Sequence, residues 1–281
     1  MLEGDSGRNV ATKPAPLTLT LIAQHRILDR AAGLNEPSGL TLNADGSALY
    51  TVSDDTKAIF KLDLKGRLCV SESFFIGVDD LEGIAISTDG SRLFLVQEEA
   101  NAILLVDLES RREVSRRPLE GMNNYHSIRH YFPDIPDNKG LEGITVNTRN
   151  NHVFVVKEGR PGLLIEVSAD LQTILNTRVL SADNGFVHAS VKAKKLDFSG
   201  LSYDSIRDTI WITSDQGQCL FHYDWNSDQV LQAIDLKTGN GGKFKRIRKS
   251  EGVAIDPVHK RMYVVSEQDQ MLYVYEIHQK E

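Results

Sequence analysis

A glycine followed by a short apolar strand recurs five times along this chain of 281 residues. The residues that follow each glycine read Leu-Thr-Leu, Ile-Ala-Ile, Ile-Thr-Val, Leu-Ser-Tyr and Val-Ala-Ile. The repeated glycines are Gly39, Gly83, Gly143, Gly200 and Gly252. Repetition at intervals of roughly 50 residues is typical of solenoids, propellers and other arrays. The chain is therefore predicted to consist of copies of one supersecondary unit.

Each unit continues with further strands. Polar turns rich in Gly, Asn, Asp and Ser, which suit tight hairpins, lead into the second strands LYTVS, LFLVQ, VFVVK, IWITS and MYVVS. The third strands are equally apolar and read AIFKLDL, AILLVDL, GLLIEVS, CLFHYDW and MLYVYEI. The first four units add a more polar outer strand, as expected of an exposed edge: RLCVSESFF, REVSRRPL, QTILNTRVL and QVLQAIDL.

The fifth unit lacks an outer strand, whereas LTLTLIAQHRIL at 17–28 precedes the first unit and belongs to no repeat. If the strand at 17–28 supplies the missing outer strand of the fifth unit, neither strand is left without a partner. The sequence thus predicts an all-β, five-bladed β-propeller of four-stranded antiparallel blades, with the last blade closed by the N-terminal strand. The main alternative is a six-bladed ring with a degenerate blade hidden at 120–139. We expect a single propeller domain over 17–281, preceded by a disordered tail or linker at 1–16.

Composition excludes several classes of protein. A hydrophobic content of 41% supplies a core without disulfides, so Cys69 and Cys219 are expected to be buried thiols. A net charge of -7 argues against a nucleic-acid partner. No run approaches the ~18 apolar residues of a membrane span. We expect a monomer.

Acidic residues recur at two positions of the unit. The inner strands of a propeller line its channel, so the residue before each glycine should lie at one channel mouth. Three of these residues are glutamates and two are serines: Glu82, Glu142, Glu251, Ser38 and Ser199. The residue 15 positions after each glycine ends the second strand at the same mouth, and it is always acidic: Asp54, Glu98, Glu158, Asp215 and Glu267.

Structural explanations compete with functional ones for these residues. An acid after a strand can simply accept backbone N–H bonds of the next turn, and the glycines can simply permit close backbone approach. Three glutamates beside a second row of acids are harder to explain in this way. Like charges repel and raise one another's pKa unless a positive charge lies between them.

Calcium is the predicted positive charge, because it takes 6–8 oxygen ligands and prefers clustered carboxylates. The basic runs KAKK at 192–195 and KFKRIRK at 243–249 are expected above the same mouth. They could form a solvated surface, salt-bridge the acids or hold an anionic ligand.

The repeated EG strands, especially LEGI at 81–84 and LEGIT at 141–145, resemble the SdiA-regulated, YjiK-like family over roughly residues 17–278. This resemblance implies a five-bladed propeller, distantly similar to NHL-repeat proteins, that binds calcium. It also implies an extracytoplasmic location, periplasmic or secreted. Ser38 and Ser199 depart from the repeated glutamate, so the cation site should be asymmetric and lie toward Glu82, Glu142 and Glu251.

Two functions remain open. The first is a binding module that takes a protein or small-molecule ligand at the channel mouth. The second is a calcium-dependent hydrolase, a lactonase, esterase or phytase, in which Glu142 or Glu251 would hold the metal and Glu158 would act as base. His126 and His130 could reach the mouth, but a surface loop explains them more simply.

Overall fold

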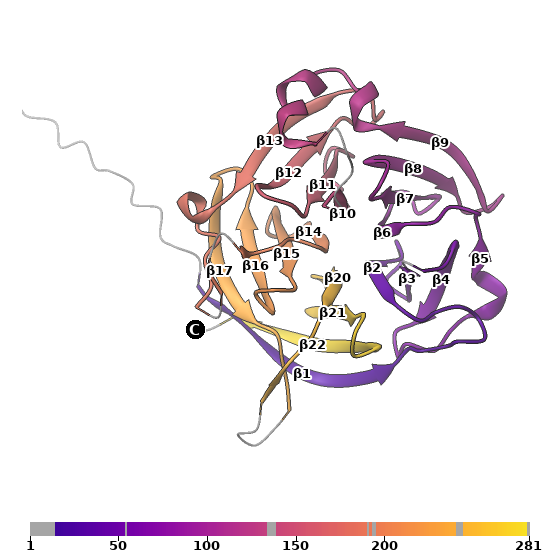
Figure 1. Cartoon of the computed structure of the whole chain (residues 1–281). Coiled ribbons are helices and arrows are strands. Elements are labelled where there is room, and N and C mark those ends of the chain that lie inside the picture. Colours follow the sequence, from indigo (N-terminus) through magenta and orange to yellow (C-terminus); the bar gives the residue numbers. More distant parts are fainter. Residues whose placement is uncertain are drawn as a thin grey trace, which may run out of the picture.

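The computed structural model describes residues 15–53, 55–133, 139–189, 191–192, 195–239 and 244–279. Five four-stranded antiparallel sheets are arranged around a central channel (Figure 1). The prediction of a five-bladed propeller is therefore confirmed. The alternative of a sixth blade at 120–139 is wrong, because the described part of that insertion forms only the short 3-10 helices η2 (Leu119–Gly121), η3 (Tyr125–Ser127) and η4 (Arg129–Tyr131).

The four strands of each blade run from the channel outward. Blade 1 consists of β2 (Pro37–Leu42), β3 (Ala48–Ser53), β4 (Ala58–Asp63) and β5 (Phe74–Phe75). Blade 2 consists of β6 (Leu81–Ile86), β7 (Arg92–Gln97), β8 (Ala102–Asp107) and β9 (Arg112–Pro118). Blade 3 consists of β10 (Leu141–Val146), β11 (Val153–Lys157), β12 (Gly162–Val167) and β13 (Ile174–Leu180).

The last two blades differ from this plan at their outer side. Blade 4 consists of β14 (Leu201–Asp204), β15 (Thr209–Ser214), β16 (Cys219–Asp224) and β17 (Gln229–Asp235). It is followed by a small hairpin of β18 (Lys237–Thr238) and β19 (Lys245–Arg246). Blade 5 consists of β20 (Ser250–Asp256), β21 (Arg261–Ser266), β22 (Met271–Gln279) and the N-terminal β1 (Leu17–Arg26). Two further 3-10 helices lie outside the insertion, η1 (Val70–Glu72) and η5 (Ala182–Asn184).

The N-terminal strand closes the ring as predicted. Strand β1 pairs antiparallel with β22 from Leu17 opposite Gln279 to Arg26 opposite Met271. Gln232 of blade 4 holds the start of β1, because its amide accepts from Leu17 N at 2.8 Å and donates to Leu17 O at 2.7 Å. The first and last strands of the chain thus share one sheet.

Blade 1 is the exception to the predicted outer strands. Its fourth strand was expected over RLCVSESFF, but β5 comprises only Phe74–Phe75, and the start of the segment adds a single bridge between Leu68 and Leu62, because η1 replaces the middle. Cys69 lies immediately before η1 at this edge and is only half-buried, so the expectation of a buried thiol is wrong there. Cys219, on the third strand of blade 4, is buried as expected.

The repeat glycines pack against the neighbouring blade. A Cβ atom on Gly83 would lie 2.4 Å from Glu142 O, one on Gly143 2.0 Å from Ser199 O, and one on Gly252 2.5 Å from Ser38 O. Gly39 and Gly200 show the same close approach, to Glu82 O and Glu251 O. Because no L side chain fits at such distances, the glycines allow the five inner strands to meet in a ring.

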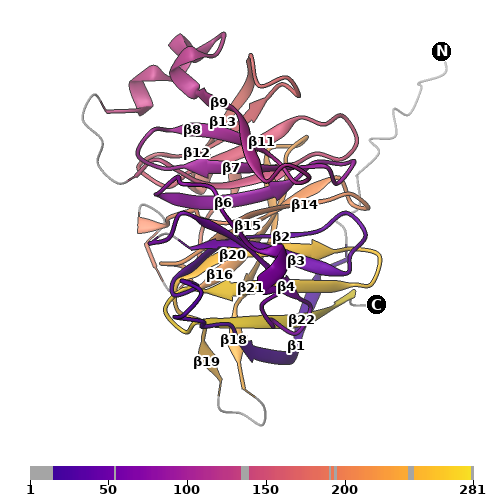
Figure 2. The same ribbon diagram turned by 90° about the vertical axis from the view of Figure 1, so that its right-hand side faces the viewer.

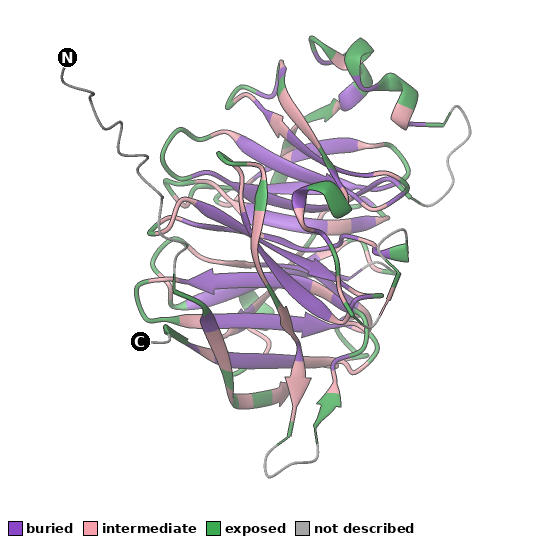
Figure 3. Cartoon of the chain, turned by 90° about the vertical axis from the view of Figure 1, so that its left-hand side faces the viewer, coloured by how far each residue is buried: buried purple, intermediate pink, exposed green. Residues whose placement is uncertain are grey.

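Apolar side chains fill the five interfaces between adjacent blades, and solvent reaches mainly the outer strands and loops (Figure 3). Alternation along each strand sends successive side chains to opposite neighbours. Val155 packs in the cluster shared with blade 2, whereas Val156 packs in the cluster shared with blade 4. The insertion packs on the first of these clusters through Met122 and Ile128, and Asn123 forms a bridge with Thr173. Figure 2 shows it standing beyond β9 and β13 at one edge of the ring.

A buried histidine makes the stability of blade 4 dependent on pH. His222 is 5% exposed, lies 2.8 Å from Thr209 Oγ1 through Nε2, and stacks on Trp211 at 4.2 Å between ring centroids. Burial lowers the pKa of His222 to about 4. The folded state therefore holds a neutral ring where the unfolded chain, with a pKa near 6.5, binds a proton.

We expect folding stability from this residue to be present above pH 6.5 and to be lost as the pH falls from 6.5 to 4. The loss at pH 4 should be about 3 kcal/mol relative to His222→Gln, which retains a hydrogen-bonding group and does not titrate. Urea unfolding of both proteins between pH 4 and 8 measures the difference. Parallel pH profiles for the two proteins would contradict the assignment.

Candidate metal site at the channel mouth

Each predicted acid in the described part of the chain lies at one mouth of the channel, where inner strands begin and second strands end. Glu82, Glu142 and Glu251 are the second residues of β6, β10 and β20. The acids at the other repeat position follow the second strands β7, β11, β15 and β21, and are Glu98, Glu158, Asp215 and Glu267. Asp54 lies outside the described residues.

A backbone hydrogen bond fixes these acids beside the start of the inner strand. Glu98 N donates to Asp80 O at 3.2 Å, and Glu158 N donates to Gly140 O at 3.0 Å. The corresponding bond in blade 5 joins Glu267 N to Lys249 O at 3.0 Å. The same backbone contact in three blades holds this position at a constant place beside the inner strand, whatever side chain it carries.

Blades 2 and 3 bring carboxylates closest together. Oxygen atoms of Glu98, Glu142 and Glu158 all lie within 4.8 Å of one another, and so do those of Asp80, Glu82 and Glu98. Glu98 belongs to both groups and is buried, at 6% exposed. Its Oε1 also accepts a hydrogen bond from Gly140 N at 3.1 Å, which orients the carboxylate toward blade 3. We call the five residues Asp80, Glu82, Glu98, Glu142 and Glu158 the acidic cluster.

Asp80 is not among the site residues predicted from the sequence. The residue has a φ of 61°, in the left-handed region, and its carboxylate accepts a hydrogen bond from Glu99 N. The equivalent residue of blade 4, Asp197, accepts from Gln216 N at 2.9 Å in the same manner. The acidic pair that precedes LEGI was a signal for Asp80, but no other blade repeats the pair, and only blades 1 and 4 have an acid at the equivalent position, Glu36 and Asp197.

The two serines of the repeat explain the asymmetry of the mouth. Ser38 Oγ donates to Glu82 Oε2 at 2.7 Å, so blade 1 stabilises the glutamate of blade 2. Ser199, at the same position of blade 4, bonds to Thr213 Oγ1 at 3.0 Å and to Ser250 O at 3.1 Å. Burial raises the pKa of Glu251, and the Ser199 hydroxyl partly opposes this rise. Glu142 instead follows a blade whose repeat residue is Glu82, and this places two carboxylates on adjacent inner strands.

Repulsion is therefore concentrated on Glu142. Burial is the largest cause that raises its pKa well above the ordinary value, followed by the charges of Glu82, Glu251, Glu98 and Glu158. Lys139 contacts the acidic cluster, with its Nζ 3.1 Å from Glu158 Oε2. Four neighbouring carboxylates thus disfavour the ionised form of Glu142.

Blades 4 and 5 compensate their acids in a different way. Lys249 Nζ lies 2.5 Å from Glu267 Oε2, and its charge also acts on Asp215 and Glu251. The basic run at 243–249 thus salt-bridges this side of the mouth, one of the three roles expected for it. Burial and the charges of Asp215 and Glu267 still raise the pKa of Glu251 to about 8. Asp215, Glu251 and Glu267 belong to no group of three metal-ligand residues within the described ranges.

The other predicted features lie away from the acidic cluster or are only partly described. His126 and His130 are exposed on η3 and η4, as expected of a surface loop, and join no such group among the described residues. The run at 192–195 is described only at Lys192 and Lys195, which are both exposed. Within the described ranges, no helix is long and apolar enough to cross a membrane.

Solved structures show where this fold occurs elsewhere. The glutaminyl cyclase of Myxococcus xanthus superposes with a TM-score of 0.62 at 12% identity, over 95% of this chain and 100% of that chain. A luciferin-regenerating enzyme superposes with a TM-score of 0.51 at 14% identity, over 90% and 95% of the two chains. At such identities the likeness concerns the fold alone.

The sequence of this chain can be compared with those of curated proteins and with family models. No curated protein matches this chain at a significant level. The family model described as SdiA-regulated matches residues 23–276, which is most of the chain. The protein therefore belongs to the SdiA-regulated family.

Proposed function

We propose that this protein is a calcium-binding propeller whose acidic cluster holds the ion and whose channel mouth binds an external ligand. The observation that carries the proposal is the convergence of carboxylate oxygens of Glu98, Glu142 and Glu158 within 4.8 Å of one another. Oxygen ligands 2.3–2.6 Å from one calcium ion lie at most about 5 Å apart. The separation in the cluster therefore matches a shared ion.

The chemistry of the ligand set favours a hard cation. All the members are carboxylates, whereas zinc sites in proteins draw on cysteine and histidine. In this proposal Glu142 and Glu158 hold the ion from blade 3 and Glu98 holds it from blade 2. Asp80 and Glu82 supply further oxygens or accept hydrogen bonds from bound water. A bound calcium would stabilise the ionised form of Glu142.

A ligand with oxygen atoms could complete the coordination sphere, because calcium takes 6–8 oxygen ligands and five carboxylates that each offer one oxygen leave positions unfilled. Lys139 lies beside Glu158 and could contact an anionic group of that ligand. We also propose an extracytoplasmic location, which the family resemblance implies. Calcium is millimolar outside the cell and would occupy even a weak site there.

The test is calorimetric titration of the chelator-treated protein with calcium, magnesium, manganese and zinc. We expect one calcium ion per chain, with magnesium weaker because it demands a smaller octahedral shell. Equal affinity for zinc and calcium would contradict a site made of hard oxygen ligands. Absence of heat and of any thermal shift with calcium would remove the proposal.

A calcium-dependent hydrolase is the second candidate. It is favoured by the pKa of Glu251, which burial and the charges of Asp215 and Glu267 raise to about 8, because a carboxyl group that exchanges its proton near neutral pH suits general acid–base chemistry. Burial and neighbouring carboxylates also raise the pKa of Glu142. If this is the activity, turnover of lactone, ester or phosphate substrates should require calcium and should fall at least about a hundredfold in Glu142→Gln. A panel of such substrates with and without chelator checks it. If no substrate of the panel were turned over while calcium still bound, the hydrolase would be excluded and the binding module would be retained.

A further inference from the structure

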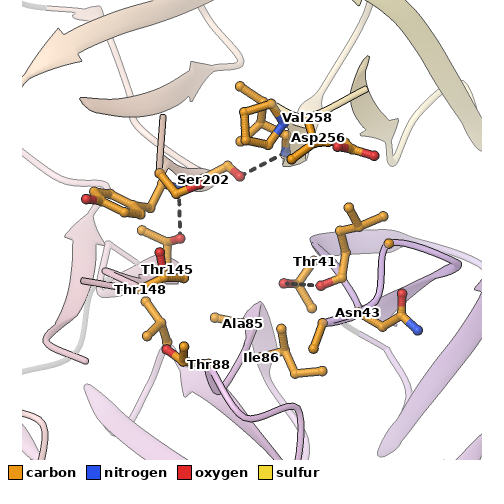
Figure 4. Close-up of a pocket in the computed structure, with 18 of the residues that line it drawn as sticks. Thr41, Asn43, Ala85, Ile86, Thr88, Thr145, Thr148, Ser202, Asp256 and Val258 are labelled. Carbon is orange, nitrogen blue, oxygen red and sulfur yellow. Dashed lines mark hydrogen bonds between the residues drawn. The ribbon is translucent and has the colours of Figure 1, made fainter. Parts of the chain in front are cut away.

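The opposite mouth of the channel contains a cavity that the acidic cluster does not use. Its volume is about 420 Å³, and all five blades line it where their inner strands end (Figure 4). The inner strand of about six residues separates this mouth from the acids, a distance of roughly 15 Å at 3.3 Å per residue. A volume of this size lies within the range of small-molecule sites.

Backbone amide groups point into this cavity. Asn43 N donates to Ala48 O, Ser87 N to Arg92 O and Asn147 N to His152 O, each across its own hairpin. In an antiparallel pair the residue next to a hydrogen-bonded one directs its N–H and C=O away from the partner strand. The preceding residues Leu42, Ile86 and Val146 therefore direct their backbone groups toward the channel.

Hydroxyl groups satisfy some of these amides and not others. Thr145 Oγ1 accepts from Tyr203 N at 3.0 Å, and Ser202 Oγ accepts from Ile255 N at 3.0 Å (Figure 4). Alanines occupy the equivalent position before the amides of Val146 and Leu42, and these are Ala85 and Ala254. A methyl group cannot accept a hydrogen bond, so these two amides are available to a ligand.

The hydroxyl groups keep donors of their own. Thr145 is 7% exposed, and as an acceptor from an amide it retains a proton to donate. Thr41 makes only a 3.5 Å contact to Leu42 O, too long for a strong hydrogen bond. The cavity therefore combines N–H and O–H donors with backbone carbonyl acceptors.

Charge decides the kind of ligand that fits. No lysine or arginine lines the cavity among the described residues, whereas Asp45 and Asp256 do. Both acids are already occupied, Asp45 by Ser47 and Asp256 by the N–H and Nδ1 of His259. An anion would meet carboxylates without a compensating cation. A cation would find both carboxylates already hydrogen-bonded within their own turns.

We propose that this cavity binds a neutral polyhydroxylated molecule of monosaccharide or disaccharide size. Its hydroxyl oxygens would accept from the amides of Leu42 and Val146 and from Thr41 and Thr145. Its C–H faces would pack on the apolar wall that includes Ile86 and Val258, the latter 73% exposed. The site is independent of the calcium site and of any ligand there.

Ligand-observed saturation-transfer NMR tests the proposal with D-glucose, D-galactose, D-xylose, maltose and lactose, and with glucuronate and glucosamine as charged analogues. We expect transfer from at least one neutral sugar at millimolar concentration. Thr41→Val, which keeps the shape and removes a hydroxyl, should weaken that affinity about five- to tenfold. Thr148→Trp, at an exposed edge of the cavity, should abolish it. Val114→Trp, on an exposed part of β9, is the matched control and should leave it unchanged.

Binding that survives chelation and Glu142→Gln supports a site at this mouth, whether or not calcium binds at the other. Three results would overturn the proposal: no transfer from any neutral sugar, preference for a charged analogue, or transfer that persists in Thr148→Trp. Loss of transfer in Glu142→Gln would place the sugar at the acidic cluster instead and would also overturn it.

Discussion

Saturating calcium is expected to raise the melting temperature of the protein by about 5 to 10 °C. Binding to the folded state alone at a hundredfold excess over Kd contributes about 2.7 kcal/mol, and each kcal/mol shifts the midpoint by about 2 to 4 °C at this chain length. Glu142→Gln should abolish this shift, because it removes one of the three carboxylates, Glu98, Glu142 and Glu158, that converge on the proposed ion. Differential scanning calorimetry with calcium or chelator measures both effects.

The same substitution should act in the opposite direction without metal. The pKa of Glu142 is raised in the folded state, so ionisation at pH 7 favours unfolding, and the neutral amide of Gln removes that cost. We therefore expect chelated Glu142→Gln to melt above the chelated wild type. If Glu142→Gln lost the calcium shift but gained no stability without metal, Glu142 would be a calcium ligand whose ionisation does not destabilise the metal-free fold.

Glu251→Gln is the matched control. Glu251 occupies the same repeat position and has a pKa of about 8, but it lies outside the acidic groups of blades 2 and 3. Its raised pKa means that stability is present at pH 4.5 and is lost as the pH rises toward 8. Glu251→Gln should relieve this loss and keep the calcium shift. If it abolished the shift as completely as Glu142→Gln, the ion would have to lie at the centre of the mouth.

Gly143→Ala is expected to destabilise the fold by about 3 kcal/mol or more, which corresponds to a fall of about 6 to 12 °C in melting temperature. The new Cβ would lie 2.0 Å from Ser199 O and 3.0 Å from Leu201 N, and both are backbone atoms of the next inner strand. Neither atom can move without shifting blade 4. Denaturant unfolding of the two proteins measures the change.

Gly121→Ala is the control for this substitution. A Cβ at Gly121 meets nothing within 4 Å, so the change should be neutral or slightly stabilising. If Gly143→Ala were as stable as Gly121→Ala, the inner strands would have to separate more easily than their packing indicates.

The ring could be predicted because the same strand pattern occurs five times, so the assignment of each unit is supported by the other four. The sequence predicted the closure because the chain held one strand too many at the start and one too few at the end. It did not predict that the outer strand of blade 1 is so short, because RLCVSESFF contains strand-forming residues throughout. An edge strand pairs with a neighbour on one side only, so the rest of the fold does not force the whole segment to be extended. The 3-10 turn at Val70–Glu72 depends on local bonds to Cys69 O that no pattern announces.

The spacing of the acids in the sequence was enough to predict that they lie at the channel mouth. It was not enough to predict which of them lie close together. Which carboxylates meet depends on Ser38 and Ser199, which stabilise Glu82 and Glu251 from the neighbouring blade. It also depends on Lys249, which the sequence placed only within a basic run. Asp80 needed a positive φ to join the cluster, and a single unrepeated acidic pair does not reveal that.

The pairing of β1 with β22 has a consequence for synthesis of the chain at the ribosome. Leu17 meets Gln279, so one strand of this sheet is made before the other four blades and its partner after them. Four blades can form while the polypeptide still emerges, but β1 must wait without its partner until β22 has been made. The strand is exposed to wrong pairing during that interval, and ring closure should be the late, slow event of folding.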